Sequence, residues 1–314
     1  MGANEGTPIN QPYSEGEIKL AVCQLGRNRS SDVSGLKAEH FKHAPEVIYR
    51  EIAEILNSSI TSGNFQSDLN TGLLVPLHKP GKVKGRVENT RPVIILPILR
   101  KITAKCLINR IYERINNEIP VSQAAYRKGR STIEHIFTIK ILADKALTSQ
   151  NYGILVTMLD MSKAFDMVSR KDLFTILQKF LMKEELYLMK ALLNNVKYSV
   201  KHGNIIGKEF STNTGVPQGD CLSAVLFTLY LAKTLNDAEI NDHNYAGIRK
   251  IFEQDHSYSL NQRISDKFLI EQQYADDIAY ISNCAFSINT KVDEAISNIH
   301  NGHLIINSEK NRKS

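Results

Sequence analysis

Tyr274-Ala275-Asp276-Asp277 lies between the apolar runs Leu269-Ile270 and Ile278-Ala279-Tyr280-Ile281. Runs of this length, rich in β-branched and aromatic residues, are typical of strands. We therefore expect two short strands that meet at an acidic turn. A further apolar run, Gly153–Leu159, ends abruptly in Asp160. Its nearly continuous apolar character predicts a strand that is buried on both faces.

Carboxylates at the ends of apolar strands require a compensating charge. An isolated buried carboxylate is costly, whereas carboxylates that share a divalent cation remain ionised. Mg²⁺ prefers oxygen ligands and is typically held by one or two carboxylates together with substrate phosphates. Asp160 and Asp276 are 276 − 160 = 116 residues apart, so only tertiary folding could bring them to one ion. Taken separately, each acidic position is better explained as a solvated turn residue.

Composition excludes several classes of protein. The chain has 314 residues, of which 42% are hydrophobic, so wholesale disorder is excluded. The 39 Lys and Arg against 33 Asp and Glu give a net charge of +6, which mildly favours a polyanionic partner. The four cysteines are scattered singly, which argues against a zinc site or a disulfide framework. No apolar run approaches the roughly 20 residues of a membrane span, and no signal peptide is visible. We expect an intracellular protein, nuclear or cytoplasmic, with no membrane partner.

Hydrophobic periodicity and capping signals place the other elements. We expect helices over residues 14–25, 45–56, 97–111, 132–147, 172–180, 185–194 and 222–235. Alternation at Tyr198, Val200 and His202 predicts a hairpin, and the polar residues 236–267 read as a surface insertion.

Three motifs in order point to a family. Asp160-Met161-Ser162-Lys163-Ala164-Phe165-Asp166, then Gly215-Val216-Pro217-Gln218-Gly219, then Tyr274-Ala275-Asp276-Asp277 resemble motifs A, B and C of reverse transcriptases. The ordered set is much more specific than the acidic tetrapeptide alone. Asp220 and Ala224 depart from the pattern, because many relatives carry a small residue and a proline there.

Three further stretches extend the resemblance to the enzymes of non-LTR retrotransposons. Gln123–Thr132 is similar to the segment that precedes the palm in those enzymes. His78–Gly81 with Thr90–Ile94 is similar to their basic fingers element, and Gly302–Lys310 to motif D. The resemblance covers nearly the whole chain, from about Gly16 to Lys310.

The resemblance implies an α+β fold, the right-hand polymerase. Fingers would comprise about residues 14–150 and the segment after Asp166. The palm would be an antiparallel sheet that carries Asp160 and the acidic turn, backed by helices such as 222–235. We divide the chain into an N-terminal extension with two helices, residues 1–58, and a reverse transcriptase domain, residues 59–314. Because the chain stops at Ser314 just after motif D, we expect a fragment of a mobile-element polyprotein that lacks the thumb.

The resemblance also implies the catalytic and metal-binding residues. Asp160 and Asp276 would bind two Mg²⁺ ions, with Asp277 in support and the Met161 carbonyl as a further ligand. This arrangement suits the in-line transfer of a nucleotidyl group.

Nucleotide-binding roles follow from the same resemblance. Lys79 and Arg91 would bind the triphosphate. The alternative interpretation is that both residues belong to a solvated basic loop. Gln218 would lie against the incoming nucleotide or the template base, and Lys310 of motif D would also bind the nucleotide. Phe165 would lie beneath the ribose and exclude a 2′-hydroxyl, whereas an isolated Phe in an apolar segment is ordinarily a core residue.

The function implied is RNA-directed DNA polymerisation, with an RNA template, a DNA primer and dNTPs as partners. Two alternatives remain open, a catalytically silent nucleic-acid-binding remnant and an RNA-synthesising polymerase with the same palm. Template specificity, insertion target and oligomeric state are not fixed by the sequence.

Overall fold

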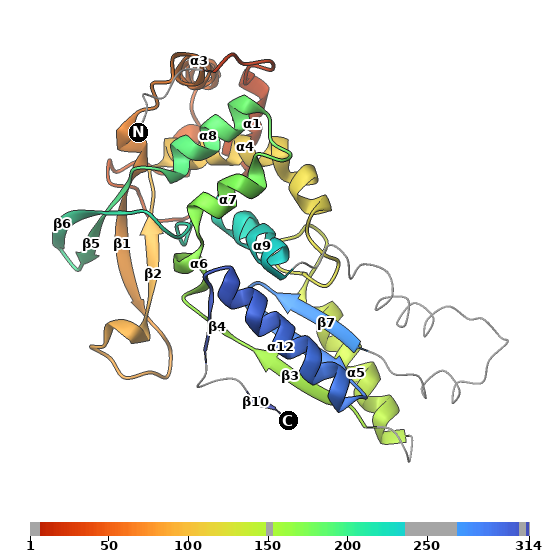
Figure 1. Ribbon diagram of the computed structural model, residues 1–314. Helices are drawn as coiled ribbons and strands as arrows, with labels where there is room; N and C mark the ends of the chain where they lie inside the picture. The colour runs from red at the N-terminus through yellow and green to blue at the C-terminus, as the bar shows by residue number, and fades with distance from the viewer. Residues whose placement is uncertain (1–6, 149–152, 236–268, 308–311, 314) are drawn as a thin grey trace. The chain divides into compact units, whose positions relative to one another are not determined.

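The computed structural model describes residues 7–148, 153–235, 269–307 and 312–313, and its fold is α+β, as predicted (Figure 1). Two compact units divide the chain. The first unit combines Met1–Arg114 with Ser169–Leu226, and the second combines Ile115–Val168 with Phe227–Ser314. Of the three boundaries between the units, one falls inside α4 (Ile98–Asn117) and one inside α9 (Cys221–Leu235), and the third lies between Val168 and Ser169, outside any helix.

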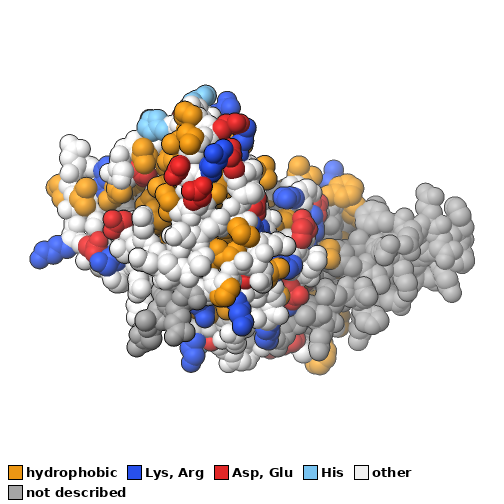
Figure 2. All heavy atoms as spheres, turned by 90° about the horizontal axis from the view of Figure 1, so that it is seen from above, with side chains coloured by type: hydrophobic (Ala, Val, Ile, Leu, Met, Phe, Trp, Pro, Cys, Tyr) orange, Lys and Arg blue, Asp and Glu red, His pale blue; other side chains and the backbone are white. Residues whose placement is uncertain are grey.

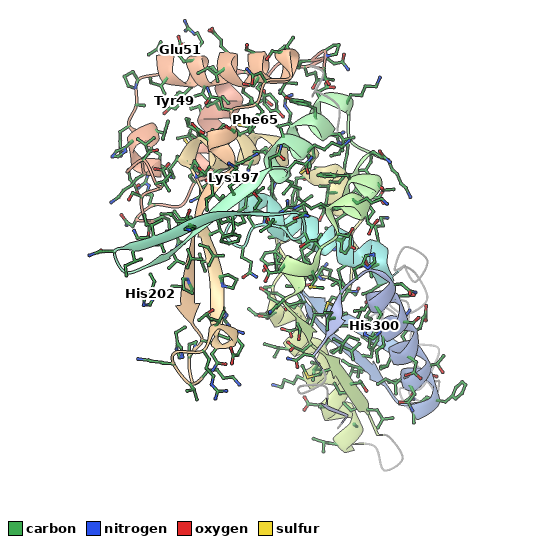
Figure 3. All side chains as sticks on the ribbon, turned by 60° about the vertical axis from the view of Figure 1, so that its left-hand side comes forward. Tyr49, Glu51, Phe65, Lys197, His202 and His300 are labelled. Carbon is green, nitrogen blue, oxygen red and sulfur yellow. The ribbon has the colours of Figure 1, made fainter. Side chains whose placement is uncertain are left out.

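The sheet of the first unit has the strand order β2-β1-β5-β6. Its strands are β1 (Thr71–His78), β2 (Thr90–Ile95), β5 (Val196–His202) and β6 (Ile205–Thr212). β1 pairs in parallel with β5, while β1–β2 and β5–β6 are antiparallel. The β5–β6 pairing confirms the predicted hairpin, and Lys197 on β5 (Figure 3) forms a 2.9 Å ion pair with Glu209 on β6.

The first unit also contains helices. They are α1 (Glu15–Gln24), α2 (Ala38–Lys42), α3 (Val47–Ser62), α7 (Arg170–Leu177) and α8 (Lys183–Leu193), together with the first parts of α4 and α9. Each helix predicted in this region is present. The predicted N-terminal extension also contains the short α2, and α3 runs beyond residue 58. The division at that residue stays a prediction.

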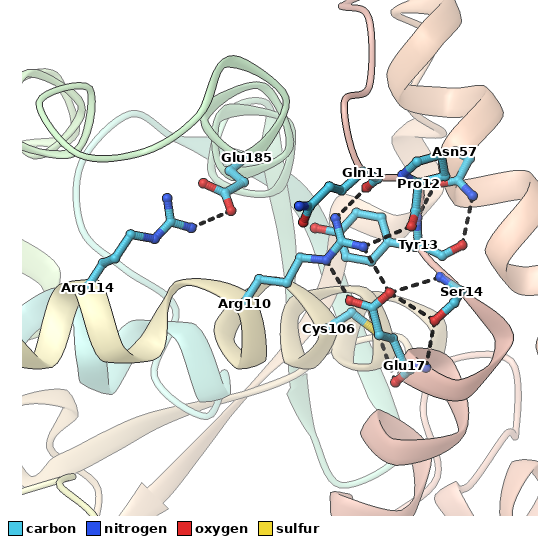
Figure 4. Close-up of polar contacts among 10 residues, drawn as sticks. All are labelled: Gln11, Pro12, Tyr13, Ser14, Glu17, Asn57, Cys106, Arg110, Arg114 and Glu185. Carbon is cyan, nitrogen blue, oxygen red and sulfur yellow. Dashed lines mark hydrogen bonds and ion pairs between the residues drawn. The ribbon is translucent and has the colours of Figure 1, made fainter.

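Arg110 on α4 holds the N-terminal segment (Figure 4). Its Nε atom lies 2.6 Å from Glu17 Oε1, and its Nη1 atom donates to the Gln11 carbonyl. The guanidinium also lies over the Tyr13 ring, 3.7 Å from its centroid. Glu17 completes a capping box with Ser14 at the start of α1. One arginine therefore ties three parts of the segment to α4.

The sheet of the second unit has the strand order β10-β3-β8-β7, with every neighbouring pair antiparallel. Its strands are β3 (Leu155–Leu159), β7 (Leu269–Tyr274), β8 (Asp277–Ser282) and β10 (Arg312–Lys313). A separate pair joins β4 (Met161–Ser162) to β9 (Ile305–Ile306). This confirms the antiparallel sheet that the sequence predicted.

Helices pack on this sheet. α12 (Ala285–Asn301) packs against β3 and β8, as Figure 1 shows. Leu142 of α5 (Thr132–Thr148) packs with Ile270 of β7 and Ile281 of β8 in a small core. The short α6 (Ala164–Met167) follows β4, and Tyr230 of α9 donates a 2.9 Å hydrogen bond to the Gly302 carbonyl.

The prediction that residues 153–159 form a strand buried on both faces is wrong. β3 begins at Leu155, which is 37% exposed, and Met158 is 56% exposed. Antiparallel sheets commonly leave part of a face uncovered, so an apolar run does not reveal how much of a strand is covered. The predicted insertion at 236–267 lies outside the described residues.

Figure 2 shows basic and acidic side chains interspersed on the face that it displays. Among the described helices, none combines the length and the apolar character that a membrane crossing requires.

The hydrogen bond from Arg110 holds the pKa of Glu17 below its ordinary value of 4.5. A lowered folded-state pKa gives stability that is present above the unfolded pKa and lost as the pH falls through the folded pKa. Glu17→Gln should therefore lower the free energy of unfolding at pH 7 by about 1 kcal/mol, after allowance for solvent exposure. The difference from wild type should shrink below about pH 4, which urea unfolding at several pH values will measure.

Glu46→Gln is the matched control, because Glu46 is paired with Lys19 on an exposed surface. Its effect on unfolding should be small at every pH. If Glu17→Gln lowered the free energy of unfolding by the same amount at pH 7 and at low pH, the proposed role of the Arg110 ion pair would be contradicted.

Candidate active site

The acidic turn is a two-residue connection between β7 and β8. The two strands pair from Leu269↔Ser282 to Tyr274↔Asp277, so Ala275 and Asp276 form the turn. Ala275 has φ of 56°, in the left-handed region that tight hairpin turns require. Asp276 is half-buried and Asp277 is exposed. The predicted pair of strands meeting at an acidic turn is confirmed.

Asp160 lies at the same end of the sheet as this turn. β3 and β8 pair antiparallel from Leu155↔Ser282 to Leu159↔Ile278. Asp160 directly follows Leu159, and Asp277 directly precedes Ile278. Residues opposite one another on antiparallel strands have Cβ atoms about 4.5–5.5 Å apart. The strand register therefore makes Asp160 a neighbour of the acidic turn.

Asn307 holds Asp160 from the other side. Its backbone N–H donates to the Asp160 carbonyl at 2.8 Å, and its Nδ2 atom donates to Asp160 Oδ2 at 2.9 Å. Asn307 follows β9, which pairs with β4 through Met161↔Ile306. No role was predicted for Asn307, although its place directly after the apolar Ile305-Ile306 is a signal of a strand end.

The donor set at this end of the sheet suits a hard cation. Asp160, Asp276 and Asp277 offer only carboxylate oxygens, which Mg²⁺ prefers. In the part of the chain that the structure describes, no three His, Cys, Asp or Glu side chains are arranged to hold an ion by themselves. In proteins, Mg²⁺ is commonly held by only one or two carboxylates and completed by substrate phosphates. The Met161 side chain is buried, and the role of its carbonyl stays a prediction.

Tyr126 lies within electrostatic reach of the acidic turn. Burial, followed by the charge of Asp276 and by Tyr274, raises the pKa of the Tyr126 phenol. The hydroxyl therefore stays protonated and able to donate across ordinary pH. The backbone of Tyr126 has φ of 60°, a conformation that is uncommon for residues other than glycine.

Phe165 is stacked on Phe227. The ring centroids are 4.7 Å apart and the planes make an angle of 22°. Phe165 lies on α6 and is half-buried, whereas Phe227 on α9 is fully buried. The stacking fixes the position of the Phe165 ring five residues after Asp160. Its predicted contact with the ribose stays a prediction.

In the first unit, the β1–β2 hairpin gathers three predicted nucleotide-binding residues. Lys79 N–H donates to the Asn89 carbonyl at 2.8 Å, and its Nζ atom donates to the Glu88 carbonyl. Arg91 on β2 is exposed opposite Leu77. Ile94 N–H donates to the Gln218 carbonyl at 2.9 Å, which joins Gly215–Gly219 to β2.

Two features fix the loop Gly215–Gly219. Gly219 has φ of 112°, and a Cβ there would lie 2.9 Å from the Ile94 carbonyl oxygen. A side chain at position 219 would therefore collide with β2. The buried Arg170 donates to the carbonyls of Gly215, Thr212 and Thr214 at 2.7–3.0 Å. No local pattern in the sequence indicates this role of Arg170.

Asp220 forms a buried ion pair with Arg100. Arg100 Nη2 lies 3.1 Å from Asp220 Oδ2, and both side chains are 0% exposed. Arg100 Nη1 also donates to Asn70 Oδ1 and to the Leu192 carbonyl, while Asp220 Oδ1 accepts from Leu222 N–H at the start of α9. Asp220, which departs from the family pattern, is therefore paired with Arg100 in this structure. Lys310 lies outside the described residues.

The comparison with known families decides the identity. Residues 77–314 match the family described as reverse transcriptase (RNA-dependent DNA polymerase). The chain belongs to the reverse transcriptase family. The resemblance drawn from the ordered motifs is confirmed.

Curated reverse transcriptases of mobile elements are similar to this chain. It is 25% identical over 278 residues to the probable RNA-directed DNA polymerase from transposon BS of Drosophila melanogaster, covering 87% of this chain and 28% of that protein. It is 26% identical over 227 residues to the RNA-directed DNA polymerase from mobile element jockey of Drosophila funebris, covering 72% of this chain and 25% of that protein. The chain therefore spans about a quarter of the length of these relatives.

Solved telomerases share the reverse transcriptase fold of this chain. The telomerase of Candida tropicalis in complex with a fragment of telomeric RNA has a TM-score of 0.51 and 14% identity. The match covers 86% of this chain and 45% of that one. The apo telomerase of the same organism has a TM-score of 0.50 and 12% identity, with 85% and 49% covered.

Asp220→Asn should leave the Arg100 guanidinium buried without an anionic partner. Breaking one partner of a buried ion pair costs about 3–5 kcal/mol, whereas replacing both with apolar residues costs less. We expect Asp220→Asn to lower the free energy of unfolding by that amount and Arg100→Met/Asp220→Leu to lower it less, as measured by urea unfolding.

Glu209→Gln provides the control, since the Lys197–Glu209 pair is half exposed. It should change the free energy of unfolding only slightly, because water screens an exposed ion pair. If Asp220→Asn and Glu209→Gln lowered the free energy of unfolding equally, a structural role for the Arg100–Asp220 pair would be contradicted.

Proposed function

We propose that this chain carries the fingers and palm of an RNA-directed DNA polymerase, which adds dNTPs to a primer 3′-hydroxyl on an RNA template. The observation that carries the proposal is the placement of Asp160 beside the acidic turn at one end of an antiparallel sheet. The order of the three motifs and membership of the reverse transcriptase family support it. The second unit would then contain the palm sheet.

The reaction would depend on carboxylates that are already in place before substrate binds. Asp160 and Asp276 would bind two Mg²⁺ ions, Asp277 would support them, and the Met161 carbonyl would supply a further oxygen. Bound there, the ions would lower the pKa of the primer hydroxyl and neutralise the charge of the triphosphate. Asn307 would keep the Asp160 carboxylate in one orientation, because it holds both the backbone and Oδ2 of that residue.

The β1–β2 hairpin would bind the incoming nucleotide. Arg91 is exposed and would pair with phosphate oxygens through its planar guanidinium, with Lys79 as a point charge. Gln218 would face the nucleotide or the template base, because its backbone is tied to β2 and its side chain is only partly buried. Lys310 keeps its predicted contact with the nucleotide. The Arg170 hydrogen bonds would hold the loop that carries Gln218.

Binding of nucleic acid would rest mainly on charge. Lys and Arg contacts with phosphates give an affinity that does not depend on sequence and falls with salt. Lys82, Lys84 and Arg86 are exposed on the loop between β1 and β2 and would make such contacts. The related telomerase whose structure contains a fragment of telomeric RNA makes an RNA template a reasonable partner.

A primer-extension assay tests the function directly. Purified protein is incubated with poly(rA)/oligo(dT), Mg²⁺ and either dTTP or UTP. A DNA product supports the proposal. An RNA product would favour the RNA-synthesising alternative, and the absence of either product, with binding to primer-template retained, would favour the silent nucleic-acid-binding alternative.

Asp160→Asn or Asp276→Asn should abolish primer extension, because a neutral amide cannot replace an anionic ligand. Without metal, the stability of either variant should rise slightly, since it removes a like charge from the cluster. Asp293→Asn, a change at an exposed position on α12, is the control and should retain wild-type activity. Extension above a few percent of wild type in either active-site variant would refute the assignment.

Phe165→Val should relax the discrimination between dNTPs and rNTPs. The Phe165 ring is stacked on Phe227, and beneath the ribose it would leave no volume for a 2′-hydroxyl, because overlap in a close-packed site is costly. We expect rNTP incorporation to rise about tenfold, which corresponds to roughly 1.4 kcal/mol of lost discrimination. Phe286→Val removes an exposed ring and should leave the selectivity unchanged. Unchanged selectivity in a folded Phe165→Val variant would exclude Phe165 as the gate.

A further inference from the structure

Gln123 is a fully buried glutamine whose side chain reaches the acidic turn. Its side chain is 0% exposed. Its Oε1 atom accepts hydrogen bonds from Ala275 N–H at 2.9 Å and from Ala125 N–H at 3.0 Å. Its Nε2 atom donates to the Ala275 carbonyl at 3.2 Å and to Gln273 Oε1 at 3.3 Å. One side chain thus bonds both the N–H and the C=O of Ala275.

The backbone around Gln123 is also attached to β7. Gln273 N–H donates to the Ser122 carbonyl at 2.9 Å, and Ala124 N–H donates to the Gln273 carbonyl at 3.0 Å. These bonds form a parallel bridge between Gln123 and Gln273. The Cα atom of Gln123 is therefore held beside the end of β7, one residue before the strand finishes.

Ala275 needs such a partner. It is 6% exposed and has a left-handed backbone conformation. Buried peptide groups that lack a hydrogen bond cost about as much as a lost bond. In a two-residue turn, the strand ladder ends at Tyr274↔Asp277 and does not include Ala275. The Gln123 amide supplies the donor and the acceptor that the ladder does not.

We propose that Gln123 is a positioning residue for the proposed metal site. By fixing the Ala275 peptide, it sets where the adjacent Asp276 and Asp277 carboxylates stand relative to Asp160. This inference rests on the proposed function for its catalytic consequence. Its consequence for metal binding and for the turn can be measured without any polymerase activity.

Only a primary amide of this length fits the position. A primary amide has donors and an acceptor, so it can pair with both the N–H and the C=O of one residue. Methionine has nearly the same length and no N–H, and asparagine keeps the amide but is one methylene shorter. Both substitutions should release the turn. Partners outside the ligand shell typically contribute 10–100-fold to metal affinity.

Gln272 offers a matched control on the same strand. It is 5% exposed, like Gln123 it carries a buried amide, and its Nε2 atom donates to the His135 carbonyl at 3.4 Å rather than to the turn. Gln272→Met removes a buried amide from β7 that makes one long hydrogen bond and leaves its Oε1 atom without a partner. Any effect that follows merely from replacing a buried glutamine with methionine should appear in this variant as well.

The experiment titrates Mn²⁺ into the free protein, with unbound Mn²⁺ followed by electron paramagnetic resonance. We expect Gln123→Met and Gln123→Asn to weaken Mn²⁺ binding at least tenfold, and Gln272→Met to change it less than twofold. Amide hydrogen exchange should show a protected Ala275 N–H in the wild type and loss of that protection in the Gln123 variants alone.

Two results would overturn the inference. The first is wild-type Mn²⁺ affinity in a folded Gln123 variant, or an equal loss in Gln272→Met. The second is rapid exchange of Ala275 N–H in the wild type, which can be measured even if both Gln123 variants fail to fold. Primer extension by the wild type separates the two proposals. A protein that does not extend primers but shows the predicted Mn²⁺ and exchange effects loses the polymerase function and keeps the positioning role.

Discussion

The antiparallel pairing of β3 with β8 is the constraint on which the candidate site depends. The side-chain period of a strand is two, so a slip of one residue would turn every side chain of β3 to the other face of the sheet. The observed register, which ends at Leu159↔Ile278, puts Asp160 beside Asp277. Carboxylates from segments more than a hundred residues apart become neighbours through this ladder alone.

Partners from two other segments hold the ends of this ladder in place. Asn307 bonds the backbone and side chain of Asp160, and Gln123 bonds the Ala275 peptide. Backbone ladders fix strand direction and register but leave a terminal residue or a turn free to fray. Side-chain amides that bond these positions would remove that freedom, which suits a site where small displacements of a carboxylate change its affinity for an ion.

The first unit uses buried guanidinium groups for the same purpose. Arg170 bonds three carbonyls of the segment 212–215, and Arg100 joins Asn70, Leu192 and Asp220. Arginine suits this task because its planar group presents several donors in fixed directions. A buried positive charge needs an anion or several carbonyl dipoles close by. A change in the conformation of these segments would leave the arginine charge without partners, and would therefore destabilise the unit.

Local patterns were sufficient to predict most helices, the β5–β6 hairpin and the acidic turn. The order of the motifs was sufficient for the family. Gln123, Asn307, Arg100 and Arg170 were not identified, because no local pattern reveals a partner that folding alone supplies. Gln123, for instance, meets Ala275 across 152 residues of chain. The burial of β3 was wrongly predicted for a related reason. An apolar run does not reveal which neighbouring element packs against the strand.

Under the proposed function, one divalent ion contacts both Asp160 and the acidic turn. Fe²⁺ bound in place of Mg²⁺ reduces added hydrogen peroxide to hydroxide and a hydroxyl radical, is itself oxidised to Fe³⁺, and the radical cuts the backbone near the ion. We predict cleavage close to Asp160 and close to Asp276, with both cuts suppressed together by excess Mg²⁺ and both lost in Asp160→Asn. Cleavage at only one of these segments, or cuts at both that respond differently to Mg²⁺, would contradict a shared metal site.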